Sequence, residues 1–157
     1  MTVVPVYESA CYLGAVQRVL EAHLRSIFPQ TKYDVTFEDP DLEEPSKPVI
    51  WLRLVKSADG RVAPFALGDD IVRLGVMKTL VYEVVVVTVE ATGGSAAAWE
   101  IAGRFEHEAI VNGKAALGAT GLKHADCTSF VLLPFPAPSK QWRMEAQLSF
   151  DVLVERR

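Results

Sequence analysis

Residues 78–90 read KTLVYEVVVVTVE, and this stretch indicates the kind of fold more directly than any other part of the chain. Val81, Val85 and Val87 would lie on one side of a strand, and Tyr82 and Val84 on the other. A strand that is covered on both faces has such a nearly continuous apolar run. In a strand with one solvent-exposed face, apolar and polar residues alternate instead. We therefore expect residues 78–90 to form a central strand of a sheet.

Other segments carry helix or strand patterns around this central strand. Apolar residues recur every three or four positions in 9–28 and again from Ala96 to about Asn112, which predicts two amphipathic helices. Residues 115–126 are expected to be a loop. Alternating or strand-like patterns predict further strands at 33–38, 49–56, 127–133 and 142–155. The pattern predicts an α+β fold: a largely antiparallel, mixed sheet of about five strands with two helices on one face.

The connection between the second and third expected strands is unusual. Residues 57–77 contain the turn signals Asp59-Gly60 and Gly68-Asp69-Asp70, yet most of the rest is apolar. Loops of about twenty residues without secondary structure are uncommon, and surface loops are usually polar. We therefore expect a long arm or hairpin, or a flap, that is buried against something else.

Length and charge exclude several classes of protein. The 157 residues fit one domain spanning 1–157. The chain has 16 Lys+Arg against 20 Asp+Glu, a net charge of −4, with five acidic residues gathered in 38–44. The chain lacks the excess of basic residues that is typical of nucleic-acid-binding domains, so we expect no specifically bound nucleic acid. No apolar run approaches the roughly 20 residues of a membrane span, so we expect no membrane partner.

The sequence contains residue types that are found in metal and catalytic sites, but their spacing does not match that of a known kind of site. His124 and Cys127 lie three residues apart without the second ligand pair that a metal site requires. The turn at 92–95 has the position of a nucleophile elbow, but Ala97 stands where such an elbow has glycine. We expect no catalytic, cofactor or metal site and no enzyme. A small ligand-binding or hydrolytic domain that uses Thr92–Ser95 stays open as an alternative.

The remaining candidates are contact residues. The second face of the strand at 49–56 combines Trp51 with Arg53, and the apolar arm follows it. Symmetric assemblies often extend an arm or an edge strand to a neighbour, because pairing satisfies the exposed backbone groups. We predict subunit or tube contacts for Trp51, Arg53, Arg61, Phe65, Arg73 and Lys78.

The order of elements resembles that of a known family. A first helix and paired strands precede the arm; the strand YEVVVVTV (82–89) then leads to the alanine-rich helix AAAWEIA (96–102), and LSFDVLV (148–154) closes the chain. In its size, the order of its elements and their residue patterns, the chain resembles the tail terminator, or tail completion, proteins of long-tailed bacteriophages and related tail-like particles. The family has no catalytic motif that could be matched residue by residue.

The resemblance implies a structural virion protein at the head-proximal end of the tail, made and assembled in the cytoplasm of a bacterial host. It implies a homo-oligomeric ring, commonly a hexamer, that caps the tail tube, ends tail polymerisation and provides the head-tail joining surface. The implied partners are the major tail-tube protein and a head-completion or connector protein. DNA would pass through the ring without being specifically bound. Another neck or head-tail connector component of the same particle is the alternative.

Overall fold

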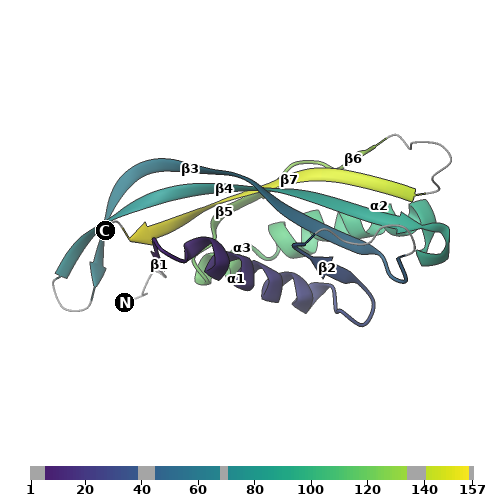
Figure 1. Ribbon diagram of the computed structural model, residues 1–157, viewed down its shortest axis with the longest axis horizontal. Helices are drawn as coiled ribbons and strands as arrows, with labels where there is room; N and C mark the ends of the chain where they lie inside the picture. The colour runs from purple at the N-terminus through teal and green to yellow at the C-terminus, as the bar shows by residue number, and fades with distance from the viewer. Residues whose placement is uncertain (1–5, 39–44, 68–70, 134–140, 156–157) are drawn as a thin grey trace.

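The valine-rich segment forms most of β4 (Ile71–Val89), which lies in the middle of the sheet, as its two apolar faces predicted. The computed structural model describes residues 6–38, 45–67, 71–133 and 141–155, with only the backbone described for 61–67 and 71–74. β4 pairs antiparallel with β3 (Val49–Leu67) along one edge and with β7 (Gln141–Glu155) along the other. These three long strands form the centre of the sheet (Figure 1).

Four shorter strands complete the sheet. β1 (Tyr7–Glu8) pairs parallel with β7, and β2 (Asp34–Thr36) pairs parallel with β3, so the sheet is mixed. β5 (Lys123–Cys127) and β6 (Val131–Leu132) both pair antiparallel with β7. The α+β fold with a mixed sheet is therefore confirmed. Among the described residues it has seven strands rather than about five, because the two-residue β1 has no sequence pattern of its own and two strands, β5 and β6, stand where one was expected at 127–133.

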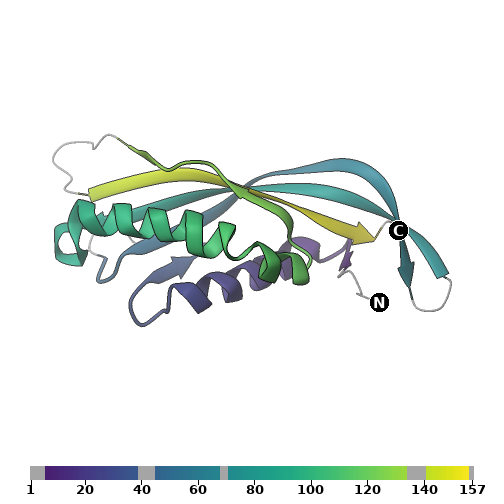
Figure 2. The same ribbon diagram turned by 180° about the vertical axis from the view of Figure 1, so that it is seen from behind.

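Helices cover one side of the sheet (Figures 1 and 2). α1 (Tyr12–Ile27) buries Val16, Leu20 and Leu24, three of the five apolar positions whose spacing predicted the helix, whereas Leu13 is 39% exposed. The second helical region begins as α2 (Gly94–Arg104) and continues as the π-helix η2 (Phe105–Val111). The helices pack on the inward residues of the sheet, where Tyr82 stacks on Phe150 with ring centroids 5.7 Å apart. No helix among the described residues is long and apolar enough to cross a membrane.

Two local expectations were wrong. Residues 115–126 are not a loop, because they hold most of α3 (Lys114–Ala119) and the greater part of β5. α3 is too short to show helical periodicity, but it buries Leu117. The expected strand at 127–133 is split between the end of β5 and β6, because the backbone N–H of Phe130 donates to the Glu106 carboxylate instead of to a neighbouring strand.

The expected arm is a hairpin. Beyond Gly75, where pairing with β7 ends, the strands of β3 and β4 pair only with each other among the described residues. Figure 1 shows this hairpin projecting past the end of β7 at one end of the molecule's long axis. We call residues 61–67 and 71–74 the arm. Its root contains a β-bulge at Gly60, where a Cβ atom would lie only 2.6 Å from the Met77 carbonyl oxygen.

Candidate functional site

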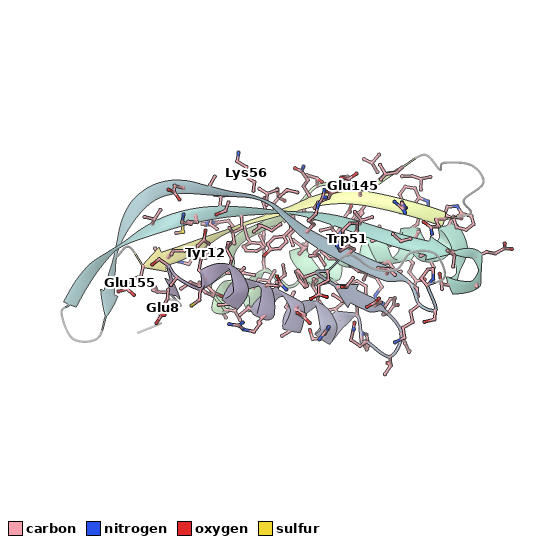
Figure 3. The ribbon with its side chains drawn as sticks, viewed as in Figure 1. Glu8, Tyr12, Trp51, Lys56, Glu145 and Glu155 are labelled. Atoms are coloured by element: carbon pink, nitrogen blue, oxygen red, sulfur yellow. The ribbon has the colours of Figure 1, made fainter. Side chains whose placement is uncertain are left out.

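The side of the sheet opposite the helices carries three rows of side chains that point away from the main core. The register of β3, β4 and β7 aligns them across the strands, and Figure 3 shows Glu145 and Lys56 pointing away from the helices. We call this surface the open face. From one end to the other, its rows are Val49, Val87 and Arg143; Trp51, Val85 and Glu145; and Arg53, Glu83 and Gln147.

The open face has an apolar centre that is separate from the main core. Val49, Val85 and Val87 form this second cluster and are 1%, 8% and 0% exposed. The half-buried Trp51 packs against the cluster. Val55, next along β3 at a β-bulge, is 45% exposed. The three valines at the centre of the open face are therefore covered, and exposed apolar surface lies along its β3 side, at Val55.

Charged residues border the apolar centre. The Arg53 guanidinium donates from Nη2 to Glu83 Oε2 at 2.5 Å, and its Cζ lies 5.9 Å from the centroid of the Trp51 ring. Glu83 also shares a side-chain hydrogen bond with Glu145 on the neighbouring strand.

The shared hydrogen bond moves the two pKa values in opposite directions. It lowers the pKa of Glu83, to which Arg53 also contributes, and it raises the pKa of Glu145. Arg53 lowers the pKa of Glu145 only through its charge. Two neighbouring carboxyl groups are thus held beside one guanidinium, and the second carboxyl has the weaker compensation.

Lys78 lies on the other side of the sheet. It forms an ion pair with Asp59 across the hairpin, and its Nζ lies 5.5 Å from the centroid of the Tyr12 ring. The pKa of Lys78 is raised chiefly by the hydrogen bond to Asp59. The hydroxyl groups of Tyr12 and Ser57 lie 2.9 Å apart, so α1 contacts the root of the arm at this point (Figure 3).

The six predicted contact residues therefore fall into three groups. Trp51 and Arg53 lie together on the open face, and Lys78 lies on the helix side. Arg61, Phe65 and Arg73 belong to the arm, where Phe65 and Arg73 are paired in register. The side chains of these three lie outside what the structure describes. Their role in contacts stays a prediction.

Sequence reasoning missed the two glutamates of the open face. The alternation in β4 places Glu83 on the same side as Val81 and Val85, so this signal was available. Glu145 could not be matched to Glu83 from the sequence, because the register between β4 and β7 joins segments about sixty residues apart. The same alternation places Lys78 with Leu80 and Tyr82, on the side that packs against the helices.

The turn at Thr92–Ser95 closes the connection between β4 and α2. The Thr92 hydroxyl accepts from the backbone N–H of Val89 at 2.9 Å and lies 3.1 Å from the Val89 carbonyl oxygen, to which it can donate. Gly93 has φ 109°, and a Cβ there would lie 2.5 Å from the Cβ of Ala97. Ser95 is exposed. The Thr92 hydroxyl and the backbone of Gly93 therefore serve to end β4 and begin α2.

The residues considered for metal binding are engaged elsewhere. His124 Nδ1 lies 3.1 Å from Asp151 Oδ2, and Asp151 Oδ1 accepts from the Thr79 hydroxyl at 2.7 Å. Burial, with smaller contributions from Glu106 and Asp126, raises the pKa of Cys127 to about 12. Within the described ranges, no group of three or more His, Cys, Asp or Glu side chains is placed to hold a metal ion.

A shallow hollow of about 240 Å³ lies between the end of α1 and β2. Its walls are mainly polar, and they include Glu21 and Arg25, which form an ion pair with each other at 2.7 Å. Gln30 accepts the backbone N–H of Val35 through its side chain. Three of the polar side chains that line the hollow, those of Glu21, Arg25 and Gln30, are therefore paired within the chain.

Comparison with known proteins shows a likeness in structure. No protein-family model matches the chain, and no curated protein matches it. Among solved structures, the chain is similar to the sheath/tube terminator of the extracellular contractile injection system PVC in its extended state, determined by cryo-EM. The TM-score is 0.56 at 20% sequence identity, and the match covers 90% of this chain and 56% of the neighbour. The chain therefore has a fold similar to that of a sheath/tube terminator.

Proposed function

We propose that this chain is a structural protein that ends the tail tube of a long-tailed bacteriophage or a tail-like particle. The observation that carries the proposal is the likeness in fold to a sheath/tube terminator over 90% of the chain. The sequence resemblance to the tail terminator family supports the same conclusion. The long hairpin, which continues past the end of β7, is the kind of element that a symmetric assembly extends to a neighbour.

In this proposal the chain forms a closed ring, a hexamer, on the last ring of the tail-tube protein. The ring ends tube growth because its far side does not accept another tube subunit, and it offers that side to a head-completion or connector protein. DNA passes through the hole without specific contacts, consistent with a net charge of −4. The role requires no catalysis, so an enzyme is not proposed.

Tube length provides the direct test. Tail-tube protein from the same genome would be assembled with and without this chain, and tube lengths would be measured by negative-stain electron microscopy. We expect shorter tubes that carry a ring at one end only. Unchanged lengths with bare ends would contradict the proposal.

Two further measurements separate the alternatives. Labelling the chain in an assembled particle distinguishes a terminator from another neck component, because only a terminator lies directly on the tube. Ser95→Ala tests the alternative of a different class. A ligand site at Thr92–Ser95 requires that this variant lose ligand binding, whereas the proposal predicts unchanged tube capping.

A further inference from the structure

We propose that the sheets of neighbouring copies join edge to edge, with the outer edge of β3 in one copy pairing antiparallel with the edge formed by β5 and β6 in the next. We call the second of these the β5–β6 edge. The inference rests on the proposed function and deepens it, because it names the contact between subunits of the ring. It is drawn from two unpaired strand edges of one chain and from the exposed side chains and charges along them.

The outer edge of β3 is free over residues 52–60. β2 pairs with β3 only at 49–51, and no other described strand pairs with this edge. Only alternate residues of an antiparallel strand bond to a given neighbour, so about half of the backbone N–H and C=O groups of 52–60 point away from β4. Val55, in the middle of this stretch, is 45% exposed. An edge of this kind is a template for a further strand.

The β5–β6 edge lies on the opposite side of the sheet. Among the described residues, β5 and β6 each pair with β7 alone. Val131 and Leu132 of β6 are 61% and 42% exposed. Together with Val55 they are three of the six large apolar side chains that are exposed in the described part of the chain. Half of these exposed apolar side chains therefore lie on the two unpaired edges, where a paired strand would cover them.

The strand directions suit pairing between two copies. β3 and β7 both run antiparallel to β4, and β5 and β6 run antiparallel to β7. A second copy placed beside the first in the same orientation therefore brings its β5–β6 edge antiparallel to β3. Within one chain β4 and β7 separate the two edges (Figure 1). The contact joins two different edges, so it is head-to-tail, and repeating it closes a ring if the rotation permits.

The two edges also carry complementary charges. Lys56 is opposite Val81 of β4, which in turn is opposite Ser149 of β7. Asp126 of β5 is opposite the same Ser149, so Lys56 and Asp126 lie at one level and on one face of the sheet. Both are exposed, and neither forms an ion pair within the described ranges. A cation on one edge and a carboxylate on the other are thus available for a neighbouring copy.

β2 determines how far the second copy is shifted along β3. Without a shift, Val131 of the second copy would lie opposite Trp51, where β2 already pairs. A shift of two residues toward the arm places β6 beyond the end of β2 and keeps every side chain on its own face. Lys56 and Asp126 are then diagonal neighbours across the two strands, within reach of a lysine side chain. Closing a sheet into a ring requires a stagger of this kind.

Two charge reversals test the contact in sedimentation velocity. Lys56→Glu brings two acidic residues together at the contact, and Asp126→Lys brings two basic ones together. Each variant alone should self-associate roughly three- to tenfold more weakly than the unaltered chain. An equimolar mixture should recover the association, because every contact between alternating copies then joins unlike charges. Lys114→Glu on α3 and Glu100→Lys on α2 make the same charge changes at exposed positions away from the edges and should associate like the unaltered chain.

Hydrogen exchange tests whether the edges themselves pair. The unaltered chain would be measured by mass spectrometry over a range of concentrations across which it associates. Peptides covering 52–60 and 123–133 should exchange more slowly in the associated state, because their outward N–H groups are then bonded. A peptide covering 95–104 in α2 should keep its exchange rate and is the control.

Three results would overturn the inference. If the unaltered chain stays monomeric at its highest soluble concentration, copies do not pair. If the mixture of the two charge variants associates no better than either variant alone, Lys56 and Asp126 do not meet. If the chain associates while both edges keep their exchange rates and gain protection only when tail-tube protein is added, the edges bind that protein instead. A ring made by other surfaces can still shorten tubes, so tube length judges the proposed function separately.

Discussion

At the scale of single residues, the two cysteines differ sharply in environment. Cys11 is exposed, whereas Cys127 is half-buried at the end of β5 and has a pKa of about 12. The thiolate is the reactive form, so at pH 8 only about one Cys127 thiol in ten thousand is ionised. We expect iodoacetamide to label Cys11 far faster than Cys127 in the folded chain, as measured by peptide mass spectrometry.

Unfolding provides the control for this labelling. In urea both thiols have ordinary surroundings, so Cys127 should then react at a rate close to that of Cys11. Equal labelling rates in the folded chain would show that the end of β5 opens readily.

The carboxyl pair of the open face predicts a small gain in stability. Because the shared hydrogen bond raises the pKa of Glu145, ionising this residue costs the folded state stability as pH rises through that pKa. Glu145→Gln keeps a hydrogen-bonding group but removes the charge. We expect the variant to be more stable at pH 7 by a few tenths to about 1 kcal/mol, with a smaller difference at pH 4.

Urea unfolding at the two pH values measures this difference. Glu100→Gln, on the exposed surface of α2, is the control and should leave the free energy of unfolding unchanged. A Glu145→Gln variant that is less stable at pH 7 would mean that the ionised pair is already compensated within one chain.

At the scale of elements, the π-helix η2 places the chain after it against α1. The Nε2 of His23 lies 2.7 Å from the Ala109 carbonyl oxygen, and Gly113 sits against both. A Cβ at Gly113 would lie 2.1 Å from that oxygen and 2.8 Å from the His23 Nε2. We expect Gly113→Ala to destabilise the fold by roughly 1–3 kcal/mol in thermal or urea unfolding.

Gly103 in α2 provides the matched control. No heavy atom lies within 4 Å of the position that its Cβ would occupy. Gly103→Ala should stabilise the fold by roughly 0.4–1 kcal/mol, since alanine favours the helix and restricts the unfolded chain. If both alanine variants had the same effect, the close packing at Gly113 would not control stability.

The elements differ in how far the sequence alone predicts them. Residues 142–155 and 78–90 were predicted well, because each repeats its pattern over a dozen or more positions. β1 was not predicted, since two residues that pair with a strand far along the chain carry no local signal. The π-helix continues the apolar pattern of α2, so the change of helical type depends on contacts such as that of His23 rather than on periodicity.

The candidate site was predictable only in part, for a related reason. Alternation places Trp51 and Arg53 on one face of β3, whereas the side on which Lys78 lies relative to them depends on the register between β3 and β4. The pairing of Glu83 with Glu145 depends on register between distant strands, which no local pattern specifies. A hairpin was among the expected forms of the arm, because a long apolar connection needs burial or strand pairing.

At the scale of the whole molecule, the stability of the core should fall in alkali. Tyr82 stacks on Phe150 and meets Phe37 edge-on, and burial raises its pKa to about 12 from an ordinary value of 10.0. The folded state therefore holds the phenol proton more tightly than the unfolded chain. This contribution is fully present below pH 10 and is lost as pH rises from 10 to about 12.

A pH series of urea unfolding tests this dependence. The loss between pH 10 and 12 should be at most about 3 kcal/mol, and Tyr82→Phe should remove it. Some alkaline loss should remain in the variant, because burial also raises the pKa of Tyr7. An identical alkaline decline in Tyr82→Phe would show that Tyr82 does not contribute.

The position of β7 has a consequence for how the chain acquires its structure. β7 pairs with β1, β4, β5 and β6, and its partner Tyr7 lies 147 positions before Val154. β7 is synthesised after all the other described strands. The nascent chain can therefore form the β3–β4 hairpin early, but β1, β5 and β6 can pair only after β7 has been made. Before β7 is made, the apolar faces of the earlier strands are exposed. Nascent chains are therefore most prone to aggregate at this stage of synthesis.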